Sequence, residues 1–357
     1  MKETVLVGLS GGVDSSTAAL LLKEQGYNVI GATMAIWGDR KTPTNFKHNK
    51  NACFGPDEKE DIIEAKKTAE KLGIEYHVFD CAKEYNEIVL KYFKSEYLKG
   101  YTPNPCVFCN ALVKFGVLPM TAKNNNVHFD KFATGHYARI VEKNGELFLK
   151  QAKFTKKDQT YFLYRLKKEQ LKDIIFPLGE YSKDEIRQFA KLAGLEAADK
   201  KDSQDFYSGD YNDLLEVTEK VGNIVDVSGK VLAQHKGIWN FTVGQRRGLP
   251  ISASEPMYVL SLNAEKNEVV VGNIDETFKK TLYANKLNCF TSNIPNKLFA
   301  KIRSSQIPTE VTTEFVEKDR VKITFEEYQK SIAKGQSVVV YDEDGCVIFG
   351  GIIDLVE

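Results

Sequence analysis

Two short stretches of the chain carry residue types that could do chemistry. The first is a glycine-rich turn, Ser10-Gly11-Gly12-Val13-Asp14-Ser15, which lies between apolar runs at 4–7 and 17–22. The second is a C-x-x-C sequence formed by Cys106 and Cys109. A glycine turn between a strand and a helix directs backbone N–H groups and a helix dipole at an anion. Two thiols at this spacing suit nucleophilic, redox or metal chemistry.

The glycine turn has the composition of a nucleotide-phosphate site. The hydroxyls of Ser10 and Ser15 can donate hydrogen bonds to phosphate oxygens, whereas Asp14 would repel bare phosphate and therefore predicts Mg²⁺ between the two. The G-x-x-x-x-G-K-[ST] pattern of kinases and GTPases is absent from the sequence. The turn therefore indicates a phosphate site of another class.

Strands and helices are predicted to alternate over residues 1 to about 140. Apolar runs at 4–7, 28–34, 76–79 and 131–134 read as strands, and periodic segments at 57–72 and 84–98 read as helices. This order predicts an α/β fold with a doubly wound parallel sheet, whose ligands lie at the carboxyl ends of the strands. The glycine turn, Met34 and Gly135-His136 all follow strand ends, so we expect them to meet.

The other segments of the chain differ in their polarity and hydrophobic periodicity. Residues 38–56 are polar, lysine-rich and aperiodic, which predicts a loop, and residues 166–222 are helical in pattern. Short β-rich runs follow residue 223 and predict a small β-barrel at the C-terminus. We therefore expect a catalytic domain over 1–205, a central domain over 206–280 and a barrel over 281–357.

Bulk composition sets limits on the partners. The 357 residues include 49 Lys and Arg and 49 Asp and Glu, so a global basic field for nucleic acid is excluded while a local basic groove is not. No apolar run is expected to reach membrane-spanning length. Six cysteines in a chain of this size favour a reducing compartment over a disulfide framework, so we expect a cytoplasmic protein with no membrane partner.

The motifs resemble those of a known family. Ser10 to Ser15 looks like the PP-loop of the N-type ATP pyrophosphatases, and residues 102–110, 133–139, 157–163, 176–179, 201–205 and 242–249 strongly resemble, in order, the motifs of the tRNA-specific 2-thiouridylases. This resemblance implies ATP-dependent replacement of the C2 oxygen of a wobble uridine by sulfur. The oxygen would be adenylated, and a cysteine-bound sulfur would then displace AMP. It also implies that tRNA and a persulfide donor or relay protein are the partners.

The resemblance also implies roles for single residues. Cys109 matches the nucleophile, and Asp14 would help to place Mg²⁺. The residues implied to hold ATP are Gly8, Leu9, Ser10, Gly11, Gly12, Val13, Asp14, Ser15, Met34 and Gly135. Those implied to touch the target base or the tRNA are Asn104, Pro105, Cys106, His136, Lys157, Asp158, Gln159, Arg303, Ser304 and Gln336.

The chain departs from the family pattern at three of these places. Ser304 stands where the family often has an aromatic residue, and Cys106 stands where it commonly has Asp. Tyr207 occupies the place of the second catalytic cysteine, and a tyrosine cannot carry a persulfide. We favour the hypothesis that Cys106 and Cys109 form a self-contained persulfide and disulfide pair. The rival is an iron–sulfur or zinc site with Cys106 and Cys109 as ligands, either alone or together with Cys53.

Other interpretations stay open at this point. The chain could be a PP-loop ligase for a small molecule, or a tRNA-binding paralogue in which sulfur transfer is lost or uses an iron–sulfur cluster or free sulfide. Cys81, Cys289 and Cys346 are expected to be packing residues, and Arg246 and Arg247 suit contact with phosphate.

Overall fold

The computed structural model describes residues 2–43, 46, 52–200 and 205–357. The chain divides into two compact units, one made of residues 1–90, 105–214 and 345–347 and the other of 91–104, 215–344 and 348–357.

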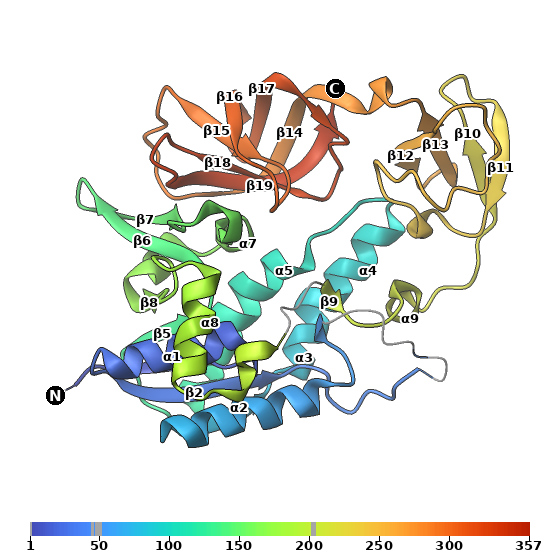
Figure 1. Cartoon of the computed structure of the whole chain (residues 1–357). Coiled ribbons are helices and arrows are strands. Elements are labelled where there is room, and N and C mark those ends of the chain that lie inside the picture. Colours follow the sequence, from blue (N-terminus) through green and yellow to red (C-terminus); the bar gives the residue numbers. More distant parts are fainter. Residues whose placement is uncertain (1, 44–45, 47–51, 201–204) are drawn as a thin grey trace. The chain divides into compact units, whose positions relative to one another are not determined.

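The first unit is built on a five-stranded parallel sheet in the order β4-β2-β1-β5-β8 (Figure 1). Its strands are β1 (Thr4–Gly8), β2 (Asn28–Ala35), β4 (Glu75–Asp80), β5 (Lys131–Thr134) and β8 (Ile174–Ile175). Because the strands are parallel, β1, β2 and β5 all end at the same edge. The predicted glycine turn, Met34 and Gly135 therefore lie at one edge of the sheet, as the sequence indicated.

Helices cover both faces of this sheet. Val5 and Val7 of β1 point to one face, where they join a buried cluster with α1 (Val13–Glu24), α2 (Glu58–Leu72) and α8 (Lys183–Leu192). Phe132 of β5 stacks edge-on against Phe115, which belongs to a helix on the other face, with ring centroids 5.4 Å apart. The doubly wound α/β prediction is therefore confirmed, because alternate residues of a buried strand each find a helical layer.

The cysteine loop opens a helix that changes its winding. It runs through α5 (Pro105–Phe108), the π-helical η2 (Cys109–Val117) and α6 (Leu118–Asn124). π-Helical turns are uncommon and are frequently found at functional sites. Cys109 is the first residue of this π segment.

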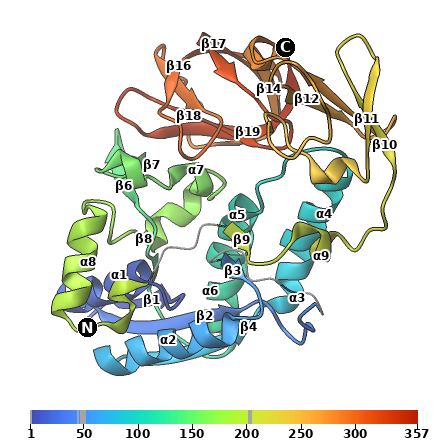
Figure 2. The same cartoon turned by 45° about the vertical axis from the view of Figure 1, so that its right-hand side comes forward.

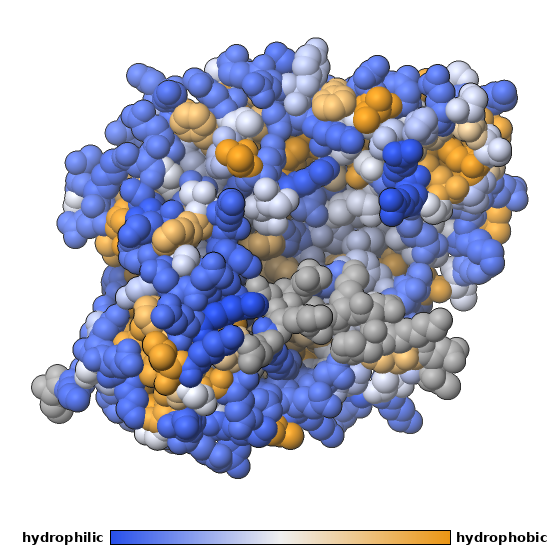
Figure 3. Space-filling view, viewed as in Figure 1, coloured by the Kyte–Doolittle hydropathy of each residue, from blue (hydrophilic) through white to orange (hydrophobic). Residues whose placement is uncertain are grey.

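The same helix corrects one expectation about membranes. The segment Pro105–Asn124 is long and apolar enough to cross a membrane by length and composition, whereas no such run was expected. Of its most apolar window, 56% is buried inside the protein, as in the core helix of a globular domain. On the face seen in Figure 3, hydrophobic side chains form patches among hydrophilic ones.

Two further predictions are corrected in the first unit. The segment 38–56 is not a loop throughout, because Ala52–Phe54 forms β3, which pairs in parallel with β9 (Asp205–Tyr207). Residues 44–45, 47–51 and 201–204 lie outside the described part. The segment 166–222 is not mainly α-helical, since it includes β8, β9 and two 3₁₀ segments, η4 (Lys168–Asp173) and η5 (Glu196–Asp199), beside α8 and α9 (Tyr211–Leu215).

The remaining elements before residue 220 are short. The helix predicted over 84–98 consists of α3 (Ala82–Tyr85), the π-helical η1 (Asn86–Leu90) and α4 (Lys91–Leu98). A hairpin of β6 (Ala138–Lys143) and β7 (Glu146–Gln151) is followed by η3 (Thr155–Lys157) and α7 (Thr160–Leu163).

The second unit contains two β structures (Figure 2). One is a four-stranded sheet of β10 (Gly222–Val225), β11 (Val231–His235), β12 (Tyr258–Asn263) and β13 (Glu268–Gly272), packed on a small core that includes Ile224 and Val269. The short 3₁₀ segment η6 (Ile238–Asn240) follows β11, and η7 (Asp275–Thr277) follows β13.

The other β structure is a closed barrel, which confirms the predicted C-terminal barrel. Its strand order is β14-β17-β16-β15-β18-β19. The strands are β14 (Phe278–Cys289), β15 (Leu298–Lys301), β16 (Thr309–Glu317), β17 (Arg320–Lys330), β18 (Ser337–Tyr341) and β19 (Val347–Val356).

Candidate active site

A cavity of about 490 Å³ lies at the carboxyl edge of the parallel sheet in the first unit. The glycine turn lines one part of it, through residues 8–10 and 12–15, and the cysteine loop lines another, through Pro105, Cys106 and Cys109. Met34 from the end of β2 and Gly135 and His136 from the end of β5 also line it. The structure thus brings together the two chemistry-bearing stretches, which are about a hundred residues apart in sequence.

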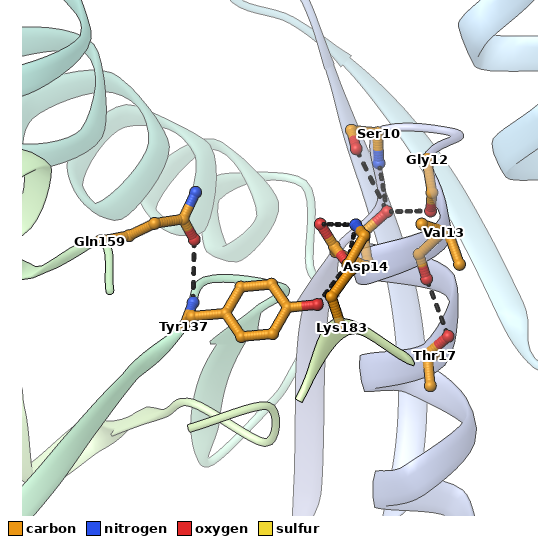
Figure 4. Close-up of polar contacts among 9 residues, drawn as sticks. Ser10, Gly12, Val13, Asp14, Thr17, Tyr137, Gln159 and Lys183 are labelled. Carbon is orange, nitrogen blue, oxygen red and sulfur yellow. Dashed lines mark hydrogen bonds and ion pairs between the residues drawn. The ribbon is translucent and has the colours of Figure 1, made fainter. Parts of the chain in front are cut away.

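The glycine turn is held in shape by its own hydroxyls (Figure 4). The Ser15 hydroxyl accepts a hydrogen bond from the Ser10 backbone N–H at 3.1 Å and donates one to the Gly12 carbonyl at 3.2 Å. Gly11 has a positive φ of 71°, and a Cβ there would lie 2.5 Å from the Asp61 carbonyl oxygen. The loop therefore requires glycine at this position for both conformation and space.

Gly135, which directly follows β5, packs against the backbone of the glycine turn. A Cβ at this position would lie 2.6 Å from both the carbonyl carbon of Asp14 and the backbone nitrogen of Ser15. The two stretches of backbone are therefore in direct contact. Gly135 sets the distance between the phosphate-binding turn and the strand that carries His136.

Asp14 is already paired with a cation. The Lys183 ammonium donates to its two carboxylate oxygens at 2.7 and 2.9 Å, and the Tyr137 hydroxyl donates to Oδ1 at 2.8 Å (Figure 4). Tyr137 is held in turn by Gln159, whose side-chain oxygen accepts from the Tyr137 backbone N–H at 2.8 Å. Lys183 comes from the start of α8, so that helix contributes a charge to the phosphate end of the cavity.

Three of the six cysteines line the cavity, and all six are free thiols. Burial raises the pKa of the Cys109 thiol to about 12 and that of Cys106 well above its ordinary value. Desolvation by the surrounding protein atoms also raises the pKa of Cys53, although part of this side chain is exposed to solvent. The Lys114 ammonium, on the same π segment as Cys109, opposes this rise at all three thiols. The cavity thus holds neutral thiols at rest, with one cation near enough to favour their thiolates.

Three of the residues predicted to contact tRNA line the cavity. Lys157 and Gln159 line the cavity, as does His136, whose Nδ1 lies 2.7 Å from the Thr134 hydroxyl. Burial, with a smaller contribution from Lys114, holds the pKa of His136 well below its usual range, so the imidazole is neutral at pH 7.

Asp158 has internal hydrogen-bond partners. It is only 7% exposed, and its Oδ1 accepts hydrogen bonds from the Thr160 hydroxyl at 2.9 Å and from the backbone nitrogens of Thr160 and Ala152 at 3.2 Å. Its carboxylate therefore organises the loop that presents Lys157 and Gln159. Its contact with tRNA stays a prediction.

Four predicted residues belong to the second unit. Asn104 is buried, while Ser304 and Gln336 are half-buried. Arg303 is exposed, and its guanidinium donates to the carbonyls of Lys330 at 3.3 Å and Ser331 at 2.7 Å. Their contact with tRNA stays a prediction.

Comparison with known proteins gives matches over the whole chain. Three family models match in order: "tRNA methyl transferase HUP domain" at residues 3–207, "tRNA methyl transferase PRC-barrel domain" at 214–273 and "Aminomethyltransferase beta-barrel domain" at 279–353. The chain is 46% identical to the tRNA-specific 2-thiouridylase MnmA of Endomicrobium trichonymphae over 98% of each chain. The chain belongs to the tRNA-specific 2-thiouridylase family.

Further relatives agree with this. The identity is 44% to the tRNA-specific 2-thiouridylase MnmA 2 of Clostridium tetani and 42% to the MnmA of Clostridioides difficile, in both cases over 99% of this chain and 99% of the relative. The family resemblance drawn from the motifs is therefore confirmed.

Within this family, Tyr207 is the departure that the structure explains most fully. The residue is completely buried and does not line the cavity. Its ring stacks on Trp37 with centroids 6.5 Å apart and contacts Phe54 at 5.9 Å, and its hydroxyl donates to Asp213 at 3.4 Å. At the position where the motif resemblance implies a second cysteine, this chain has a core aromatic residue.

Sequence reasoning missed two cations and undervalued one thiol. Lys114 was not predicted, and Lys183 gave no signal because it lies 169 residues from its partner Asp14. Cys53 was considered only as a metal ligand in a loop. Cys81 and Cys346 are buried as expected, whereas Cys289 is exposed and so is not a packing residue.

Proposed function

We propose that this protein is an ATP-dependent tRNA 2-thiouridylase that thiolates the C2 position of a wobble uridine. The observation that supports this most directly is the single cavity lined by both the PP-loop and the cysteine loop. Adenylation and sulfur transfer must act on the same C2 carbon, so their groups must face one site. The relatives are tRNA-specific 2-thiouridylases by name, which agrees with this activity.

The first step would form an adenylated uridine. The C2 oxygen attacks the α-phosphorus of ATP, a P–O bond forms, pyrophosphate leaves and the N3 proton of uracil is lost to solvent. Backbone N–H groups of Gly11 and Gly12 and the start of α1 would bind the pyrophosphate. The close approach of Gly135 to this turn leaves the strand end at Met34 for the adenosine.

Mg²⁺ would be held at this site by Asp14 together with the phosphates of ATP. In the described residues, no group of three or more His, Cys, Asp or Glu side chains could hold a metal ion. Mg²⁺ commonly binds through one carboxylate, phosphate oxygens and water, so Asp14 together with ATP is sufficient. When bound, the ion would neutralise phosphate charge. Lys183 would then shift from Asp14 towards the phosphates.

The second step would transfer sulfur. The terminal sulfur of a Cys109 persulfide attacks C2, and AMP leaves with the electron pair of the C–O bond. The Cys106 thiolate then attacks Cys109 Sγ, which forms a Cys106–Cys109 disulfide and releases 2-thiouridine. An external dithiol must reduce the disulfide before the next turnover. The π-helical start at Cys109 and the nearby Lys114 ammonium support this assignment.

The tRNA would be held by groups from both units. His136, Lys157 and Gln159 line the cavity and would meet the splayed uridine, while Arg303, Ser304 and Gln336 would contact tRNA elsewhere. Residues 1–205 would carry the chemistry, and 206–280 and 281–357 would bind the substrate. Because tRNA and reduced thiols are found together in the cytoplasm, we propose that location.

The test is thiolation of a wobble-uridine tRNA with ATP, Mg²⁺ and a small-molecule persulfide, with the iron content assayed alongside. The wild type should form 2-thiouridine and AMP, and Cys109→Ser should abolish the product. Cys106→Ser should stop at one tRNA per enzyme bound to Cys109 through the transferred sulfur, and an added thiol should release this tRNA as the 2-thiouridine product.

Three results would overturn the proposal. Methylation of the tRNA from S-adenosylmethionine would favour the activity that the family-model descriptions name. ATP–pyrophosphate exchange driven by a metabolite without RNA would indicate a small-molecule ligase. Activity that requires bound iron would replace the disulfide step.

A further inference from the structure

Cys53 lies on a strand that the sequence did not predict. The strand β3 pairs in parallel with β9, in the register Ala52 with Asp205 and Phe54 with Tyr207. Its thiol points at the Phe206 carbonyl, with Sγ and O 3.7 Å apart, and Phe206 also lines the cavity. Cys53 is therefore a positioned residue of the cavity wall.

The residue that replaces the family cysteine holds this strand. Phe54 is fully buried and contacts Tyr207 at 5.9 Å, Trp37 at 4.9 Å and Tyr85 at 5.0 Å between ring centroids. Successive side chains of a strand point to opposite sides. With Phe54 anchored in this aromatic cluster, Cys53 is turned to the other side, where the cavity lies.

The three cavity thiols differ in access. Cys53 is exposed, Cys106 is half-buried and Cys109 is only 7% exposed. A donor that carries sulfur on a persulfide must bring its terminal sulfur to the thiolate that it loads. Cys53 meets this requirement, whereas Cys109, which must face the uridine, is covered.

We propose that Cys53 is the acceptor thiol of the sulfur relay, which takes sulfur from the donor and passes it to Cys109. This inference rests on the proposed function. The Cys53 thiolate attacks the terminal sulfur of the donor persulfide, the S–S bond of the donor breaks, and the donor leaves as a thiolate. The Cys109 thiolate then attacks the terminal sulfur of the Cys53 persulfide and regenerates the Cys53 thiolate. Neither exchange consumes electrons.

The electrostatics of the cavity agree with this route. Lys114 acts on Cys53 and Cys109 alike and favours the thiolate of each, so one cation assists both exchanges. Cys106 is left for the disulfide step. Cys53 on β3 would thus supply the thiol that is missing at Tyr207 on the neighbouring strand β9.

The experiment compares the wild type with Cys53→Ser and with Cys289→Ser, which removes an exposed cysteine on β14 in the other unit. Each protein is given ATP, wobble-uridine tRNA and either a small-molecule persulfide or sodium sulfide. A persulfide on Cys53 meets Cys109 at an effective concentration in the millimolar range. Without Cys53, the free persulfide at about 0.1 mM must load the covered Cys109 directly, so we expect Cys53→Ser to be about tenfold slower. Sulfide reaches C2 without the relay, so its rate should be unchanged in both variants.

Persulfide on each cysteine is located by alkylation and peptide mass spectrometry in Cys109→Ser, where sulfur should accumulate on Cys53. The inference is overturned if Cys53→Ser matches Cys289→Ser with persulfide, if it loses both activities equally, or if Cys53 carries no persulfide. If the wild type forms no 2-thiouridine from either sulfur source, the proposed function itself fails.

Discussion

Replacing Gly135 by alanine is expected to disturb the phosphate-binding turn. The new Cβ would lie 2.6 Å from the backbone at Asp14 and Ser15, whereas ordinary contact begins near 3.4 Å. The difference of 0.8 Å must come from movement of the turn or of β5. Both neighbours are main-chain atoms of regular elements, so no flexible side chain can yield in their place.

The magnitude follows from this displacement. Overpacking of this kind costs about 1–3 kcal/mol of unfolding free energy. A shift approaching 1 Å in a site that positions reactants can lower the rate by about 100-fold. We therefore expect Gly135→Ala to be less stable and to lose about 10- to 100-fold in kcat/KM for ATP.

The matched control is Gly8→Ala in the same site. A Cβ at Gly8 meets its nearest atom, in the Phe132 ring, at 3.5 Å, and Gly8 is not in the left-handed region. The assays are calorimetric ATP binding and thermal unfolding of wild type and both variants. Gly135→Ala with the stability and ATP affinity of Gly8→Ala would show that the close approach of β5 to the turn does not matter.

Three other predictions concern pH, a buried carboxylate and the arginine turn. The pKa of the Cys109 thiol is raised from 9.0 to about 12, so its contribution to stability is present below pH 9.0 and is lost as the pH rises towards 12. Above pH 9.0, the unfolding free energy of Cys109→Ala measured with denaturant should therefore fall less steeply with pH than that of wild type. Equal pH slopes for the two proteins would refute this. Asp158→Ala should lower the unfolding free energy by about 1–3 kcal/mol, because buried donors lose their acceptor, and unchanged unfolding would contradict its internal role. The side chains of Arg246 and Arg247 are exposed, so replacing both by alanine should reduce the salt dependence of tRNA binding by about one phosphate contact each, and an unchanged slope would exclude this turn from the interface.

Local patterns were reliable wherever the chemistry depends on sequence neighbours. The turn from Ser10 to Ser15, the strand ends at Met34 and Gly135 and the C-terminal barrel were all predicted, because apolar runs and glycines fix such elements locally. The hydrogen-bond partners of Asp158 could not be predicted from its motif. Only the structure shows that the backbone of Ala152 and the side chain of Thr160 surround its carboxylate.

By itself the sequence determined the fold class, the family and the two stretches that must do the chemistry, because motif order and strand–helix alternation are written along the chain. Only the tertiary structure decided which side chains meet. Lys183 reaches Asp14 across 169 positions, and β3 pairs with β9 across about 150, so that Cys53 enters the cavity beside the aromatic residue that replaced a cysteine. Such pairings depend on burial and strand register between distant segments, and no local pattern records them.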